Sequence, residues 1–390
     1  MLLLHNSAIR LLFAGQALYW SCAIINITLA ALVGIQLAPA TALTTLPLAL
    51  MVLGSLFSVQ PLSSFMQRHG RRPGLMLGAS AGVLAGLLCA LGITVASFSL
   101  FCLGCLALGA YQASMMYYRF AAQEAVSDAH KGRATAYVVA GGVLAALLAP
   151  SLLLWSRDAV GLPFVGAYLA LAALAALGLA LMACLREGAA PVPGSAGLAV
   201  IRQLLGRPAV RAAIATTAVG HGLMILVMNA TPLAMRFCGF PVEVSAQVIQ
   251  WHSLGMFLPA FVAGPLVDRF GSRRIAVLGA VTLLVSAGIA ISGVSHAQFL
   301  LSSFLLGLGW NLMLVAGTTL LGEGHSASER GQAQGLMELG NGSVAALASL
   351  ASGALVNGIG WGAVNLAILP LVAIALLMLL PARRAVLAQP

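Results

Sequence analysis

The sequence predicts an all-helical membrane protein with twelve transmembrane helices arranged as two related six-helix bundles. Three observations support this fold class: the composition, a series of long apolar segments, and an internal repeat. Residues of the set AVILMFWYC make up 61% of the 390 residues, and charged residues make up 7%. A soluble domain has about 25% charged residues. A chain this poor in charge has lipid as its solvent, which excludes soluble enzymes, nucleic-acid-binding proteins and disordered scaffolds.

Twelve apolar segments are long enough to cross a bilayer as helices, for which about 20 residues are needed. Shorter segments with alternating polarity would indicate a membrane β-barrel, and none of these runs has that pattern. The expected spans are residues 9–34, 41–66, 74–96, 98–121, 134–156, 161–185, 210–236, 243–267, 274–295, 297–321, 332–358 and 362–381.

The basic residues sort to one side of the membrane when the N-terminus is placed in the cytoplasm. The chain has 19 Lys and Arg against 9 Asp and Glu, and in this orientation Arg157 and Arg236 alone fall outside. Cytoplasmic loops are rich in Lys and Arg, so the sorting supports both the number of spans and the orientation. We expect a monomer of the bacterial inner membrane with both termini in the cytoplasm, and we interpret the first apolar stretch as a span rather than a cleaved signal peptide.

The chain contains a repeat at about half its length. A Pro- and Gly-rich connector at 186–209 separates an N-terminal bundle, 1–185, from a C-terminal bundle, 210–390. The loop after the second span reads SSFMQRHGRRPGLML from Ser63, and the loop after the eighth reads GPLVDRFGSRRIAVL from Gly264. Two related bundles of this kind are typical of secondary transporters.

These two loops resemble the cytoplasmic gate signature of the major facilitator superfamily. The matching residues of the second copy are Gly264, Leu266, Asp268, Arg269, Gly271 and Arg273. The first copy retains Arg68, Gly70, Arg71 and Arg72. It has Ser63 and Gln67 in place of the glycine and the aspartate, so we expect the first half of the gate to lack one ion pair.

The seventh and eighth spans contain soft metal ligands at helical spacing. Met224 and Met228 lie on one face of the seventh span, and His252 and Met256 on one face of the eighth. In an antiparallel pair of helices, Met228 would stand level with His252 and Met224 with Met256, about 12 to 18 Å from the outer loop. Neutral thioether and imidazole ligands suit Cu(I). His221, one turn before Met224, is a further candidate ligand.

The pair of motifs MxxxM and HxxxM resembles the CcoA-type copper importers of the superfamily. The segments YYRFAA, AGGVLAALLAP, VIQWHSLGMFLPAF and GWGAVNLA also resemble that group. The resemblance implies copper binding at Met224, Met228, His252 and Met256, and import of copper for assembly of cbb3-type cytochrome oxidase. It also implies a periplasmic copper donor and a cytoplasmic chaperone or pump as partners, with copper as cargo and no prosthetic group.

Other functions remain open, because relatives of this group transport riboflavin. The alternatives are a carrier of a small organic molecule such as riboflavin, a proton-coupled drug exporter, and a copper sensor or assembly scaffold. The sequence has no phosphate-binding loop for ATP-driven pumping and no nucleophile–base pair at usable spacing, so we do not expect an enzyme.

Four further positions are weaker candidates. Cys102 and Cys105 share a helix face and could hold a soft metal or undergo redox change, and Cys238 could capture copper at the outer surface. Glu338 is an acidic residue within an apolar run. It is a candidate for proton coupling, or it pairs with Arg119 or Arg330 near the cytoplasmic surface.

Overall fold

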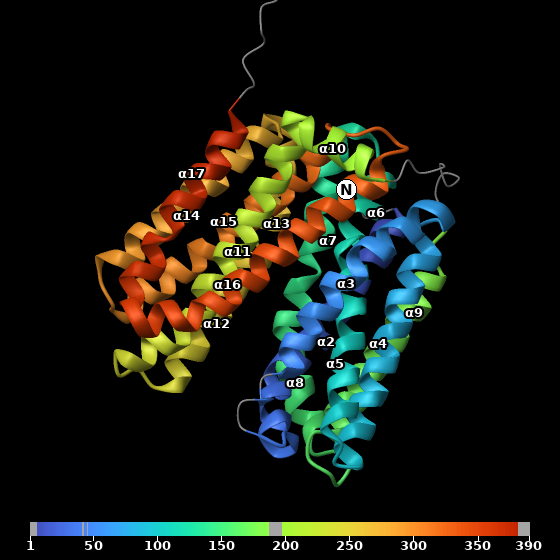
Figure 1. The fold of residues 1–390 in the computed structure, drawn as a ribbon, viewed down its shortest axis with the longest axis vertical. Coiled ribbons are helices and arrows are strands. Elements are labelled where there is room, and N and C mark those ends of the chain that lie inside the picture. Colours follow the sequence, from blue (N-terminus) through green and yellow to red (C-terminus); the bar gives the residue numbers. More distant parts are fainter. Residues whose placement is uncertain (1–5, 41–42, 45, 187–196, 381–390) are drawn as a thin grey trace, which may run out of the picture.

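A computed structural model describes residues 6–40, 43–44, 46–186 and 197–380, and helices are the regular secondary structure of this described part. The first half is a bundle that follows the chain from blue to green in Figure 1. Its helices are α2 (Ser7–Leu37), α3 (Leu46–His69), α4 (Arg71–Thr94), α5 (Phe98–Met116), α6 (Tyr118–Glu124), the short η2 (Asp128–His130), α7 (Lys131–Ala140), α8 (Gly142–Arg157) and α9 (Val165–Ala183).

The second half forms the neighbouring bundle, drawn in yellow to red in Figure 1. Its helices are α11 (Pro208–Phe237), α12 (Val242–Phe257), α13 (Ala260–Phe270), α14 (Ser272–Ser292), α15 (His296–Gly322), α16 (Arg330–Leu366) and α17 (Ile368–Leu379). The expected connector 186–209 contains a short helix, α10 (Leu198–Gly206), while residues 187–196 lie outside the described part. Within α10 the Leu204 side chain is buried and Leu198 is exposed.

Ten segments of the described chain are long and apolar enough to cross a membrane by themselves. The other two expected spans are also helical: α12 continues into α13 after a break at Leu258 and Pro259, and α16 begins at Arg330. Gly360, with φ of 84°, interrupts α16 from within, and the part of α16 after this break belongs to the final span, Gly358–Leu379. Two more spans are each divided into two helices by a residue with negative φ: α5 and α6 meet at Tyr117, and α7 and α8 meet at Gly141.

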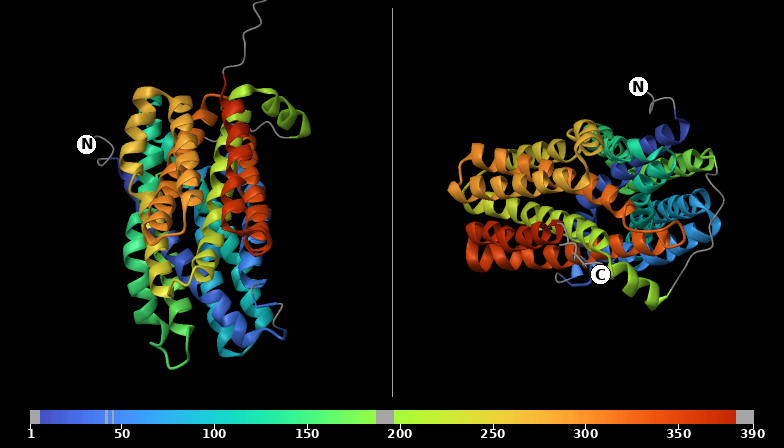
Figure 2. Two further views of the ribbon diagram at one scale, coloured as in Figure 1. Left: turned by 90° about the vertical axis from the view of Figure 1, so that its left-hand side faces the viewer. Right: turned by 90° about the horizontal axis from the view of Figure 1, so that it is seen from above.

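The start of α2 and the end of α17 lie at the same end of the molecule, as expected for an even number of spans (Figures 1 and 2). We call it the cytoplasmic end because the basic loops gather there. The two bundles meet at this end and diverge toward the other (Figure 1). The principal contacts between them are α3 against α16 and α7 against α13, so the described conformation is closed on the cytoplasmic side.

Candidate functional site

The two gate loops form matching contacts with the opposite bundle. Asp268 accepts hydrogen bonds from the backbone N–H groups of Gly132, at 2.8 Å, and Arg133, at 3.3 Å, at the start of α7. Gln67 accepts from the backbone N–H of Gly331 at the start of α16. The expected difference is present: Asp268 also forms an ion pair with Arg133, at 3.2 Å, whereas the Gln67 amide donates to the Ala327 carbonyl.

Close approach of the backbones explains the glycine of the second loop. A Cβ atom at Gly264 would stand 2.6 Å from the Arg133 Cα and 2.8 Å from the Gly132 carbonyl oxygen, both in the other bundle. In the first loop, the Ser63 hydroxyl fits at this position because it donates to the Gly331 carbonyl at 2.6 Å. Gly70 and Gly271 precede α4 and α14 with φ of 93° and 86°, values that favour glycine.

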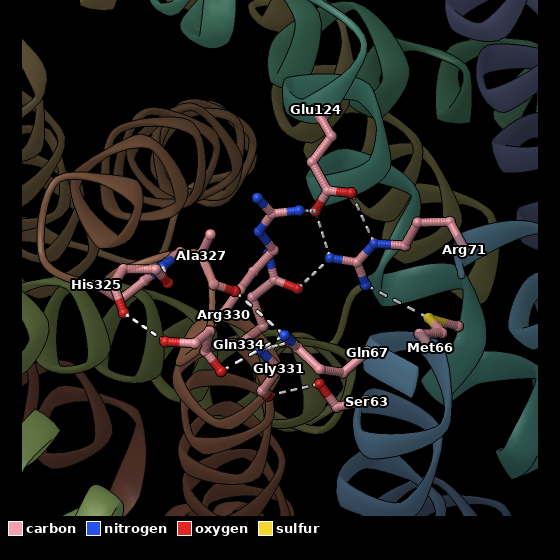
Figure 3. A network of polar contacts seen from close by, with 12 residues as sticks. Ser63, Met66, Gln67, Arg71, Glu124, His325, Ala327, Arg330, Gly331 and Gln334 are labelled. Carbon is pink, nitrogen blue, oxygen red and sulfur yellow. Dashed lines mark hydrogen bonds and ion pairs between the residues drawn. The ribbon is translucent and has the colours of Figure 1, made fainter. Parts of the chain in front are cut away.

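The arginines of the two loops make different contacts. Arg71 forms a bidentate ion pair with Glu124 at the end of α6 and donates to Gln334 of α16. Arg330 approaches the same carboxylate at 3.5 Å, so Glu124 lies between charges of both bundles (Figure 3). Arg273 donates to the Leu379 carbonyl at the end of α17, and the Arg269 guanidinium lies over the Phe270 ring. Arg68 is exposed, and Arg72 is half-buried.

The loop before α16 is held within its own bundle by a second ion pair. Arg207 donates two hydrogen bonds to the Glu329 carboxylate, at 2.7 and 2.8 Å. These bonds, together with those from the Ser326 backbone and hydroxyl, lower the pKa of Glu329 to about 2. Burial lowers the pKa of nearby His325, so this imidazole is neutral at pH 7. The loop is therefore rigidly tied to the start of α11.

Glu338 pairs with Arg119, one of the two arginines that the sequence analysis considered as its partner. The carboxylate of Glu338 is 1% exposed, and its pairing with Arg119 of α6 joins the two bundles. Asn341 donates to the second carboxylate oxygen at 3.3 Å. Removing one partner of a buried ion pair leaves an uncompensated charge, so this contact strongly favours the closed cytoplasmic end.

A continuous chain of aromatic rings crosses between the bundles. Trp20 of α2 contacts Phe257 of α12 with ring centroids 5.2 Å apart, and Phe257 contacts Trp310 of α15 at 6.3 Å. The Trp310 ring N–H donates to Nδ1 of His221, at 3.1 Å. The indole N–H of Trp20 is buried and has no hydrogen-bond partner in the described part of the chain.

These four rings lie at one depth. Trp20 and His221 are 13 residues from the cytoplasmic starts of α2 and α11, Phe257 is 13 residues before the end of α13, and Trp310 is 12 before the end of α15. At 1.5 Å per residue, all four lie about 18 to 20 Å from the cytoplasmic end. This is near the middle of the membrane, where transporters bind their substrates.

The expected metal ligands lie further from the cytoplasmic end than the rings, about 21 to 30 Å by the same rise per residue. They come from α11 and α12, which make few contacts with each other because α15 packs against both. His252 is buried, and its Nδ1–H donates a hydrogen bond to the Ser303 carbonyl of α15, at 2.8 Å. Its Nε2 is buried without a hydrogen-bond partner among the described residues. Met224 and Met256 are buried in the same apolar core, and Met228 packs at its edge. The Nδ1 lone pair of His221 is occupied by Trp310, so His221 is a poor candidate ligand.

Comparison with known proteins places the chain in a family. The model described as "Major Facilitator Superfamily" matches residues 233–390. The riboflavin transporter RfnT of Brucella anthropi is 38% identical over 379 residues, which cover 95% of this chain and 94% of that protein. The uncharacterized MFS-type transporter YdeG of Bacillus subtilis is 30% identical over 91% of this chain and 86% of that protein.

The chain belongs to the major facilitator superfamily. The fold agrees: the outward conformation of the superfamily transporter FucP matches with a TM-score of 0.81 over 95% of this chain and 97% of that one, at 14% identity. The protein is therefore a multi-pass membrane transporter with bacterial relatives, and not an enzyme. None of these three proteins carries copper in its name.

The cysteine candidates lie apart from this central region. Cys105 of α5 is fully buried, and its thiol donates to Asn26 Oδ1 at 3.5 Å. The same oxygen accepts from the Tyr168 hydroxyl, so Cys105 belongs to a polar contact inside the first bundle. Cys102 lines a shallow pocket near the start of α3 and α5. Cys238 is exposed at the end of α11.

The sequence analysis missed the residues that join the bundles at mid-depth, chiefly Trp20, Phe257 and Trp310. It also missed Glu124. One signal was available: tryptophan is enriched at the membrane interfaces, and Trp20 and Trp310 lie near the middle of their spans. Contact between rings from three separate spans is a property of the tertiary structure.

Proposed function

We propose that this protein is a secondary transporter that imports a flat heteroaromatic solute of the riboflavin class. The observation that carries the proposal is the aromatic chain of Trp20, Phe257 and Trp310 at mid-depth. It is supported by the 38% identity to a protein named as a riboflavin transporter. This was the alternative, rather than the first expectation, of the sequence analysis.

Stacking explains why such rings suit such a cargo. Offset or edge-to-face aromatic pairs contribute about 0.5 to 1.5 kcal/mol beyond the burial of their area. A three-ring isoalloxazine offers a large face to Trp20 and Phe257, and its carbonyl oxygens can accept a hydrogen bond from the Trp20 N–H, which has no partner among the described residues. Because Trp20 and Phe257 belong to opposite bundles and contact each other, a cargo stacked on this pair contacts both halves and would be passed inward as the bundles rock.

Uptake of radiolabelled riboflavin into proteoliposomes tests the proposal. We expect Trp20→Ala to lower the initial rate at least tenfold at normal protein level, because one stacking face and one hydrogen-bond donor are lost. Trp155→Ala is the matched control, since Trp155 is 75% exposed near the outer end of α8. Absence of riboflavin uptake by the unaltered protein in either direction would refute the proposal, and transport outward alone would favour an exporter.

Copper is the second candidate, and His252 favours it. Its Nδ1–H donates to the Ser303 carbonyl, as the second nitrogen of a metal-binding histidine commonly does, while the buried Nε2 has no partner among the residues that the structure describes. Met256 lies one turn further along the same helix. We expect radioactive copper uptake to fall in His252→Ala and Met256→Ala if copper is the cargo, whereas Trp20→Ala would then affect it little. The reverse pattern assigns the site to the organic solute.

We further propose that Glu338 couples transport to protons. The cytoplasmic end cannot open without separating Glu338 from Arg119, and protonation of the carboxylate removes the attraction that opposes this step. Glu338→Gln is expected to abolish accumulation driven by a pH gradient while it retains exchange of labelled for unlabelled cargo. Asp158→Asn, at an exposed loop at the outer end, is the control. Gradient-driven accumulation by Glu338→Gln would show that another group carries the proton.

A further inference from the structure

A polar cavity of about 480 Å³ lies at the cytoplasmic end, on the gate itself. Both bundles line it: Gln67 and Arg71 come from the first gate loop, and Arg330 and Gln334 from the first two turns of α16. Figure 3 shows these side chains converging between the helix ends. Pockets for small molecules span roughly 300 to 1,000 Å³, so this cavity can hold a ligand of mononucleotide size.

The charge of the cavity favours an anion. Four cationic side chains and two carboxylates line it, a net charge of +2 from the Lys, Arg, Asp and Glu side chains; they are Arg71, Lys131, Arg186, Arg330, Glu124 and Asp128. Both carboxylates are already neutralised within the wall: Glu124 by Arg71, at 2.6 Å, and Asp128 by Lys131, at 2.7 Å. The surplus charge therefore resides on the other two arginines.

Arg186 and Arg330 retain unused donors. Arg186 is exposed and has no hydrogen bond or ion pair to any residue in the described ranges. Arg330 approaches Glu124 at a long 3.5 Å. Gln67 and Gln334 stand in the same wall. Guanidinium groups bind phosphate through paired, charge-assisted hydrogen bonds, which makes a phosphate group the natural occupant.

We propose that this cavity binds a phosphorylated ligand from the cytoplasm, and that the ligand holds the cytoplasmic gate closed. The first candidate, which rests on the proposed function, is the phosphorylated form of the cargo; for riboflavin it is riboflavin 5′-phosphate. Residues of both bundles meet around the cavity in the closed state, so a ligand that contacts both binds this state better and shifts the population toward it. The product of the kinase that consumes the cargo would thus slow further uptake.

Binding to the purified protein tests the site without any transport. Riboflavin 5′-phosphate, riboflavin and inorganic phosphate are titrated in detergent and in nanodiscs with and without anionic lipid. We expect riboflavin 5′-phosphate to bind from solution both in detergent and in nanodiscs. Arg186→Ser and Arg330→Gln should each lower the affinity for it about tenfold, because each removes one charge-assisted contact. Arg202→Ser, which removes an exposed cation of α10 outside the cavity, should leave the affinity unchanged. Binding abolished by anionic lipid in the nanodisc would assign the cavity to a lipid headgroup and overturn a soluble ligand.

Transport then tests the consequence. Proteoliposomes loaded with riboflavin 5′-phosphate should take up labelled riboflavin more slowly than empty ones, and Arg186→Ser should remove the difference. Equal binding of riboflavin and its phosphate, or binding that neither arginine substitution weakens, would overturn the inference. If riboflavin is not transported at all, the proposed function fails, while the binding experiment still decides whether the cavity takes a phosphate group.

Discussion

Replacing Gly264 by alanine should open the cytoplasmic gate. The added Cβ would lie 2.6 Å from the Arg133 Cα and 2.8 Å from the Gly132 carbonyl oxygen, whereas ordinary contacts begin at 3.4 Å. The gate must therefore widen by up to about 0.8 Å against backbone atoms, which have no rotamer with which to move aside. Overpacking of this kind costs about 1 to 3 kcal/mol.

The clash exists in the closed state alone, because Arg133 and Gly132 belong to the bundle opposite Gly264. The full 1 to 3 kcal/mol therefore destabilises the closed gate relative to the open one, and the ratio of closed to open molecules should fall about 5- to 150-fold. Gly288→Ala is the matched control, since no atom of the described chain lies within 4 Å of a Cβ added to this helical glycine of α14.

Spin labels on the two sides of the gate report the change. Ala129→Cys and Ala327→Cys place labels on exposed loops of opposite bundles, after the exposed Cys184 and Cys238 have been replaced by serine. Pulsed measurements of the distance between the two labels should show an additional population at longer distance in Gly264→Ala and an unchanged distance distribution in Gly288→Ala. A distribution identical to that of the unaltered gate, in a protein with normal thermal unfolding, would refute the steric argument.

Three further predictions concern stability. Arg119→Met alone should lower the free energy of unfolding by about 3 to 5 kcal/mol, because it leaves the Glu338 carboxylate buried and unpaired, and the double variant Arg119→Met/Glu338→Leu should recover most of that loss in thermal unfolding. Glu329 has its pKa lowered from 4.5 to about 2, so its ion pair with Arg207 stabilises the fold above pH 4.5 and the effect is lost as the pH falls toward 2. Unfolding temperatures measured from pH 6 to pH 3 should therefore fall less steeply in Arg207→Gln than in the unaltered protein. Gly271→Ala should cost about 1 to 2 kcal/mol through its positive φ, without any clash; an unchanged unfolding temperature would contradict this.

The sequence by itself determined the solvent, the orientation and the family. A helix that crosses the bilayer must be long and apolar, and the preference of basic residues for the cytoplasm sets the orientation of the spans. Both the membrane location and the orientation can therefore be predicted from composition and from the order of residues along the chain. The gate loops were also readable, because their glycines and charges lie within 15 consecutive residues of each copy.

Tertiary structure alone decided which distant residues meet. The sequence aligned α11 with α12 as direct neighbours, but α15 packs against both, and His252 contacts Ser303 as a result. Likewise the ion pair of Glu338 with Arg119, the ring contact of Trp20 with Phe257 and the polar cavity at the gate each join segments more than 200 residues apart. Helical periodicity predicts the helix face on which a residue lies, but the packing of the bundles determines which residues that face contacts.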